Sequence, residues 1–287
     1  MDICIFIHLT LYVYACYNVA TNKPPYAEDK KEIWTMKKII ATILATLMLT
    51  CSFAGCSTPD KDGMTIEKGK LIMSTNAEFP PYEMTTDDGG FKGIDIEIAQ
   101  AIADKLGLEL VIDDMGFDAA MQAVQNGQSD ICMAGLTVDE ERLKVMDFSV
   151  TYATGKQVVI VKEGSDVTLD NLGEKLIGTQ KATTSNIYCT DDYGEDHVVG
   201  YDSSITAVQA LLNGQVDCVV VDNATAQELV KANPGLVILE TEYVTEDYAI
   251  AVDKGNTELL NAINEALNAL IADGTVQKII NKYIKAE

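Results

Sequence analysis

The chain has 287 residues, a formal net charge of −23 and 47% hydrophobic residues. A chain of this length and composition is globular and buries one large core or two smaller ones. The negative charge argues against nucleic acid and against an anionic membrane surface as binding partners, because both attract positive charge.

The first 56 residues contain an export signal. Two lysines follow Met36, an apolar run covers residues 39–49, and small residues lead to Cys56. Residues 36–56 are therefore predicted to be a signal peptide. The segment FAGC resembles the lipobox of bacterial lipoproteins, which implies that Cys56 is acylated and anchors the mature chain. Phe53 departs from the leucine that is usual in that motif.

The segments on either side of this signal are interpreted separately. Residues 3–20 are apolar enough for a short membrane segment. Because a complete export signal starts at Met36, we interpret residues 1–35 as an upstream extension from a misplaced start codon, with a real membrane segment as the alternative. Residues 57–68 are small and polar and predict a flexible tether.

Strand and helix patterns alternate from residue 69 onward. The segment GKLIMST (69–75) predicts a strand, and so does LELVI (108–112). Between them, isoleucines 94, 98 and 102 and Leu106 recur every four residues up to Gly107, as in a helix that ends at a glycine. This alternation predicts an α/β fold built on largely parallel strands.

An internal echo suggests two similar halves. The segments MQAVQNGQSDICMAG (121–135) and VQALLNGQVDCVVVD (208–222) share a helix that ends in Asn-Gly, then a glutamine, then a strand that opens with an aspartate. The alternative is that any two αβ units look alike at this level.

Charged groups of opposite sign follow the two echoed strands. Gly135, Thr137 and Arg142 come after the first strand, and Asp222 ends the second. Ligands of open α/β sheets bind beyond the carboxyl ends of the strands. Arg142 is the only arginine of the chain, and a guanidinium grips a carboxylate with two hydrogen bonds. An α-amino acid, with its carboxylate and ammonium, would satisfy both groups. A surface arginine with no special role is the alternative.

Cysteine and histidine give no catalytic or metal motif. Cys132, Cys189 and Cys218 lack the spacing of a zinc site or a disulfide framework. They are interpreted as buried or stray thiols. His197 has no serine motif near it. No catalytic residue, metal or cofactor is assigned.

Four motifs in order carry a resemblance to a known family. They are NAEFPPYE (76–83), GIDIEIAQAIADKLG (93–107), AGLTVDEERLKVMDFS (134–149) and the segment 248–284. Together they resemble the polar amino-acid-binding proteins of bacterial ABC importers, the extracellular solute-binding proteins of family 3. The resemblance implies a type II periplasmic-binding-protein-like fold with two Rossmann-like α/β lobes and a two-crossing hinge. The first lobe would span residues 69–155 and 248–287 and the second 156–247, with crossings near 154–156 and 246–248.

The resemblance also implies roles for individual residues. Arg142 matches the arginine that pairs with the ligand carboxylate, and Asp222 the aspartate that takes the ammonium. The other matched or neighbouring ligand-binding candidates are Gly135, Thr137, Thr183, Thr184, Phe79, Phe117, Asn76, Glu78 and Gln180. Core packing is the alternative for both phenylalanines, and a solvated surface is the alternative for Glu78.

Two positions depart from the family pattern. Asn76 stands where relatives that bind basic amino acids often have aspartate, and Ala182 replaces the glycine of the family's Gly-Thr-Thr turn. The first departure weakens a lysine or arginine assignment. The second predicts a slightly altered turn before Thr183.

The implied function is capture of a polar amino acid, basic ones included, outside the cell membrane. The partners would be an ABC permease with its ATPase subunit, the membrane through the lipid anchor, and no nucleic acid, with the protein itself a monomer. A cyclohexadienyl or arogenate dehydratase and an amino-acid-sensing module are the alternatives on the same fold.

Overall fold

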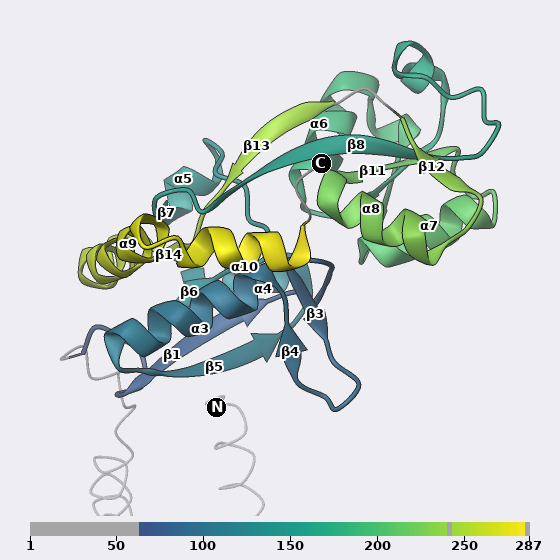
Figure 1. The fold of residues 1–287 in the computed structure, drawn as a ribbon. Helices are drawn as coiled ribbons and strands as arrows, with labels where there is room; N and C mark the ends of the chain where they lie inside the picture. Colours follow the sequence, from purple (N-terminus) through teal and green to yellow (C-terminus); the bar gives the residue numbers. More distant parts are fainter. Residues whose placement is uncertain (1–62, 240–242, 285–287) are drawn as a thin grey trace, which may run out of the picture. The chain divides into compact units, whose positions relative to one another are not determined.

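The computed structural model describes residues 63–239 and 243–284, which form two α/β lobes (Figure 1). The predicted signal peptide, the upstream extension and Cys56 lie outside these residues. The predicted α/β class with two lobes is confirmed. Nowhere in the described ranges is there a helix with the length and apolar character needed to cross a membrane.

The first lobe is built on a five-stranded sheet. Its strand order is β5 (Glu109–Asp114), β1 (Lys70–Thr75), β6 (Ile131–Cys132), β14 (Ala251–Asp253) and β7 (Met146–Phe148). Strand β1 is parallel to both neighbours, whereas β14 is antiparallel to β6 and β7. A small antiparallel sheet joins β2 (Glu78–Phe79), β3 (Glu83–Thr85) and β4 (Phe91–Lys92).

Helices cover both faces of this sheet. Each face of the sheet packs against its own hydrophobic core. Successive side chains of a strand point to opposite faces, so Ile131 lies in one core and Cys132 in the other. The first core is closed by α3 (Ile94–Leu106), α9 (Thr257–Ala272) and α10 (Thr275–Tyr283). The second core is closed by α4 (Phe117–Gln125), and the short α5 (Arg142–Val145) precedes β7.

The second lobe repeats this layering on a six-stranded sheet. The order is β10 (Val198–Tyr201), β9 (Ile177–Gln180), β11 (Cys218–Asp222), β8 (Ala153–Lys162) and β12 (Leu236–Ile238), with β13 (Val244–Tyr248) also paired to β8. Helices α7 (Ser204–Leu212) and α8 (Asn223–Ala232) cover one face. Helix α6 (Thr184–Tyr193) and the 3-10 turn η1 (Leu169–Glu174) cover the other, and a second 3-10 turn, η2 (Glu195–His197), precedes β10.

The echoed segments adopt matching structures. Gly127 and Gly214 follow α4 and α7 with φ of 65° and 72°, the left-handed conformation expected for Asn-Gly at a helix end. Asp130 accepts a hydrogen bond from the backbone N–H of Ile72 over 2.7 Å, and Asp217 accepts one from Leu176 over 2.8 Å. Each aspartate thus fixes the start of the neighbouring strand, which explains why the echo includes it.

Strands β8 and β13 run antiparallel and side by side (Figure 1). Residues 153–157 of β8 pair with residues 244–248 of β13. Both of the predicted hinge crossings fall on this strand pair.

The last two helices are separated at Gly274, which has φ of 79° between α9 and α10. The predicted tether differs at its end: the backbone N–H of Ile66 donates to Asp130 over 2.7 Å, and Met64 packs on the core of the first lobe. The end of the predicted tether is therefore ordered, because its apolar side chains, such as Met64, are buried against the first lobe.

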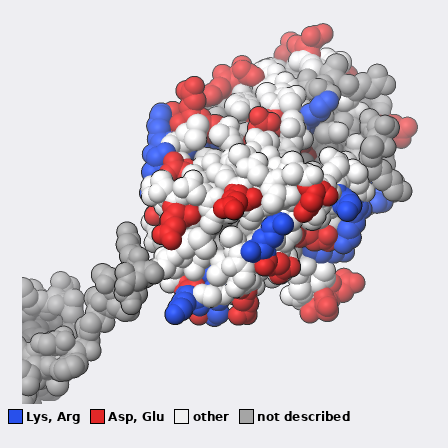
Figure 2. Space-filling view, turned by 60° about the vertical axis from the view of Figure 1, so that its left-hand side comes forward, with Lys and Arg blue, Asp and Glu red and all other residues white. Residues whose placement is uncertain are grey.

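The surface mixes both signs of charge. On the face that Figure 2 shows, acidic and basic side chains of the described residues lie interspersed, and the basic ones form no broad patch there.

Candidate functional site

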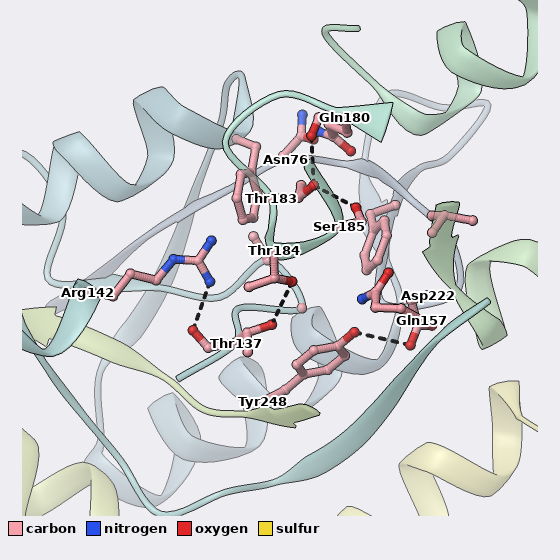
Figure 3. A pocket seen from close by; sticks show the side chains of 15 residues that line it. Asn76, Thr137, Arg142, Gln157, Gln180, Thr183, Thr184, Ser185, Asp222 and Tyr248 are labelled. Atoms are coloured by element: carbon pink, nitrogen blue, oxygen red, sulfur yellow. Dashed lines mark hydrogen bonds between the residues drawn. The ribbon is translucent and has the colours of Figure 1, made fainter. Parts of the chain in front are cut away.

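A pocket lies where the two lobes meet (Figure 3). Its cavity volume is about 30 Å³, so the surrounding side chains fill most of the space between the lobes. The lining residues are Asn76, Phe79, Phe117, Ala134, Gly135, Thr137, Arg142, Gln157, Gln180, Thr183, Thr184, Ser185, Val221, Asp222 and Tyr248.

Arg142 opens helix α5 and is buried, with 7% of its surface exposed. The carboxylate of Asp139 accepts from its backbone N–H over 2.8 Å and lies 3.1 Å from Nε. Nη1 donates to the backbone oxygen of Thr137 over 2.8 Å and Nη2 to that of Ala182 over 3.1 Å. The guanidinium lies over the ring of Phe117, 5.6 Å from its centroid. Burial lowers the pKa of Arg142, and the group is held in a fixed orientation.

Asp222 ends strand β11 and caps helix α8. Its Oδ1 accepts from the backbone N–H groups of Ala224 (2.9 Å) and Thr225 (3.3 Å). Its Oδ2 accepts from the hydroxyl of Tyr248 (3.1 Å) and the backbone N–H of Lys156 (3.2 Å). Burial raises the pKa of Asp222 to about 6, and the four hydrogen bonds oppose this rise.

The N-terminus of helix α6 faces the same pocket. Thr183 is its N-cap, and its hydroxyl accepts from the backbone N–H of Asn186 over 3.4 Å. The first N–H groups of a helix have no partner within the helix and attract anions. The hydroxyl oxygens of Thr184 and Thr137, from different lobes, are 3.5 Å apart. Ala182, just before the cap, has φ of 63°, the only positive φ of a residue other than glycine in the described ranges.

Asn76 and Gln180 form another link between the lobes. Gln180 Nε2 donates to Asn76 Oδ1 over 2.8 Å, and Asn76 Nδ2 donates to the backbone oxygen of Met115 over 3.0 Å. Both side chains are buried and uncharged. One end of the pocket is therefore lined by neutral amides.

Phe79 and Phe117 line the pocket from the first lobe. Phe79 is half-buried and stacks on Tyr82, with ring centroids 5.5 Å apart. Gly135 lies against Phe79, and a Cβ at this glycine would be 2.6 Å from the ring. Its backbone N–H donates to Asp95 Oδ2 over 2.8 Å, and burial raises the pKa of Asp95 to about 6. A buried carboxylate thus holds the Gly135 loop in place.

Ten of the eleven predicted ligand-binding residues line the pocket. Glu78 does not: it is exposed in β2, where its neighbour Phe79 points to the pocket. Because adjacent side chains of a strand point to opposite sides, Glu78 faces away from the pocket when Phe79 faces into it.

The structure adds pocket residues that the sequence analysis missed. They are Gln157, Ser185 and Tyr248, together with the apolar Ala134 and Val221. Gln157 and Tyr248 lie on β8 and β13. The predicted hinge crossings could have indicated these two residues, because the strands that join two lobes lie at the base of the cleft between them.

The three cysteines of the described residues are free and buried, as predicted. Burial raises the pKa of each thiol to about 12. Within the described residues, no group of three or more histidine, cysteine or acidic side chains is placed to hold a metal ion.

The comparisons with known proteins fit this geometry. Residues 71–286 match the bacterial extracellular solute-binding proteins, family 3. The chain belongs to this family. The resemblance drawn from the four sequence motifs is thereby confirmed.

Among its family 3 relatives, the chain is 30% identical to the probable histidine-binding protein of Neisseria gonorrhoeae, over 88% of this chain and 97% of that protein. It is 31% identical to ABC transporter arginine-binding protein 1 of Escherichia coli (strain K12), over 86% of this chain and 99% of that one. The solved structure of an ancestral arginine-binding protein bound to glutamine has a TM-score of 0.72 and 40% identity, covering 77% of this chain and 100% of that one.

Proposed function

We propose that this protein captures a polar L-amino acid between its lobes and delivers it to the permease of an ABC importer. One observation carries the proposal: the buried guanidinium of Arg142 and the buried carboxylate of Asp222 line one pocket. An α-amino acid carries the two charges that complement this pair. The names of the relatives, which bind histidine and arginine, support the same class of ligand.

The ligand carboxylate would lie between Arg142 and the N-terminus of α6. The guanidinium supplies paired N–H donors, and the helix supplies backbone N–H groups at Thr184 and Ser185. The ammonium would lie on the side of Asp222, with the hydroxyl of Thr137 nearby. Because α5 and α6 belong to different lobes, a bound carboxylate contacts both. The ligand therefore stabilises the closed form over an open one.

The ligand side chain would lie between the two phenylalanines and end at Asn76 and Gln180. Asp222 is the only carboxylate among the lining residues, and the ammonium already pairs with it. A lysine or arginine side chain would thus bring a second positive charge without a buried counter-charge. We therefore expect an uncharged polar side chain, with glutamine as the first amino acid to test.

The proposed location is the outer face of the cell membrane, with Cys56 as the lipid anchor. An exported binding protein has to stay near its permease, and the lipobox-like FAGC segment gives a means of attachment. We assign no catalytic residue. In a dehydratase, a general acid would have to reach the substrate. Asp222, the one carboxylate among the lining residues, is assigned here to the ligand ammonium, and Glu78 lies outside the lining.

The test is the thermal unfolding of the purified protein against the twenty amino acids, cystine and ornithine. A ligand at a hundred times its dissociation constant adds about 2.7 kcal/mol to the free energy of unfolding. We expect the melting temperature to rise with a polar amino acid and not with alanine. Turnover of prephenate or arogenate, with no shift for any amino acid, would favour the dehydratase instead.

A further inference from the structure

The side chain of Gln157 lines the pocket from strand β8 and is 4% exposed. Its Nε2 donates to Oε2 of Glu246 over 2.7 Å. Its other polar atom, Oε1, is buried and has no hydrogen-bond partner among the described residues. Since buried polar atoms are normally paired, an unpartnered acceptor in a binding pocket indicates a contact that the ligand completes.

Glu246 determines which atom of the amide is available. A carboxylate only accepts hydrogen bonds, so the NH₂ group of Gln157 has to face it. The choice between oxygen and nitrogen at the end of this side chain is therefore fixed by its partner. The oxygen is left as an acceptor for the pocket.

The strand register places this oxygen beside Asp222. Gln157 pairs directly with Asp222 across β8 and β11, so the two side chains lie on the same face of the sheet. On its other side, Gln157 pairs with Val244 of β13, and Glu246 is the diagonal neighbour two residues further. Figure 3 shows the Gln157 amide next to Asp222.

Asp222 alone offers the ligand few free lone pairs. Its two oxygens already accept four hydrogen bonds, two from the start of α8 and two from Tyr248 and Lys156. A carboxylate has about four acceptor positions. An ammonium group has three N–H donors, so it needs acceptors near Asp222 in addition to the charge of Asp222.

We propose that Oε1 of Gln157 accepts a hydrogen bond from the α-ammonium of the ligand, and that Glu246 acts as the positioning residue that orients this amide. The inference rests on the proposed capture of an amino acid and deepens it. In this arrangement Asp222 supplies the negative charge near the ammonium, and Gln157, on the hinge strand β8, accepts a hydrogen bond from it directly. Ligand binding thereby contacts the strand pair that joins the lobes.

The test is isothermal titration calorimetry of the purified protein and of Gln157→Met with L-glutamine, L-arginine, L-histidine and L-threonine, the last of which has no side-chain N–H donor. Methionine keeps the length of the side chain and removes the acceptor. We expect every amino acid that the parent binds to lose about tenfold in affinity, the size of one hydrogen bond to a charged group. Gln180→Met is the matched control: it removes the amide at the other end of the pocket and should change the order of preference among amino acids.

Glu246→Gln tests the positioning role. The new amide no longer forces the NH₂ of Gln157 toward it, so we expect a loss of about threefold in the parent. In the Gln157→Met background the same change should leave affinity unaltered, whereas a purely structural effect of Glu246 on the hinge would persist there. The double variant also removes the charge of Glu246, which Gln157→Met leaves buried and unpaired. If Gln157→Met folds poorly, the double variant replaces it in the affinity measurement.

The outcomes separate this inference from the proposed function. Equal affinity in the parent and Gln157→Met would overturn the contact, with amino-acid capture unaffected. A loss confined to ligands with side-chain N–H donors would overturn the assignment to the α-ammonium. If the parent bound none of the twenty amino acids, the proposed function and this inference would both fall.

Discussion

The guanidinium of Arg142 donates a hydrogen bond to the backbone oxygen of Ala182, with Nη2 and the oxygen 3.1 Å apart. The two residues belong to different lobes, and Ala182 immediately precedes the cap of helix α6. The guanidinium proposed to bind the ligand carboxylate thus already contacts the segment that leads into α6, the helix that supplies the other proposed donors. A carboxylate between them would replace a neutral acceptor by a charged one, which is the stronger partner for arginine.

Arg142→Ala should weaken amino-acid binding by about 2 to 5 kcal/mol, because a desolvated ligand carboxylate loses its charged partner. Arg142→Lys should recover only part of this loss, since lysine lacks the planar pair of donors. Calorimetry with the best amino acid measures both variants. Lys144→Ala is the control on the same helix, where Lys144 pairs with Glu141 at the surface. If Arg142→Ala matched the parent in affinity, the carboxylate assignment would be wrong.

Ala182→Gly should stabilise the protein by about 0.5 to 1 kcal/mol. A left-handed conformation costs a residue with a Cβ about 1 to 2 kcal/mol, and the greater freedom of glycine in the unfolded chain offsets part of the gain. Urea unfolding measures the difference. Ala262→Gly, in the middle of α9 and not among its buried residues, is the matched control and should destabilise by about 0.5 to 1 kcal/mol. Destabilisation by both changes would contradict strain at Ala182.

The turn before α6 illustrates what the sequence allowed. The position of Ala182 in a Gly-Thr-Thr-like turn indicated an altered loop, and the structure gives it the positive φ that glycine usually supplies. The echoed helix and strand pairs were equally accessible, because the Asn-Gly end of each helix acts locally. Periodicity and helix-end signals therefore predicted several elements of each lobe.

Contacts between distant strands were not accessible in the same way. The pairing of Gln157 with Asp222 depends on the register of β8 and β11. The contact of Gln157 with Glu246 depends on the register of β8 and β13, and Glu246 lies about ninety residues further along the chain. No local pattern encodes these registers. The exposed side of β2 was missed for a similar reason, since a two-residue strand is too short to show which of Glu78 and Phe79 faces inward.

Affinity should fall as the pH falls through about 6. Burial raises the pKa of Asp222 to about 6 in the protein without ligand, and an ammonium ligand binds the ionised form. Protonation therefore competes with binding, and affinity should be about tenfold lower near pH 5 than near pH 7.5. Calorimetry across this range should also detect proton release on binding near pH 6.

Two variants identify the group responsible for this dependence. Asp222→Asn should bind weakly with an affinity that does not change between about pH 5 and 7.5. The pKa of Asp95 is also raised to about 6 by burial, so Asp95→Asn is the necessary control and should retain the pH dependence of the parent. If the affinity of Asp95→Asn did not change with pH, the pH dependence would be due to Asp95 and not to Asp222.

Gly155→Ala should impair both folding and ligand-driven closure. A Cβ at this position of β8 would be 2.2 Å from the hydroxyl of Tyr248 and 2.7 Å from Oδ2 of Asp222. The clash pushes apart two groups that are hydrogen-bonded over 3.1 Å. We expect a loss of about 1 to 3 kcal/mol in stability from overpacking, with a weaker response to ligand.

Small-angle scattering with and without the best amino acid separates these two effects. The parent should become more compact when ligand is added, and Gly155→Ala should show less of this change at full saturation. Gly173→Ala is the matched control, because its nearest neighbour would be 3.6 Å from the new Cβ, an ordinary contact. Full compaction in Gly155→Ala would mean that the strand pair tolerates the added methyl group. The role of Gly155 would then be limited to folding.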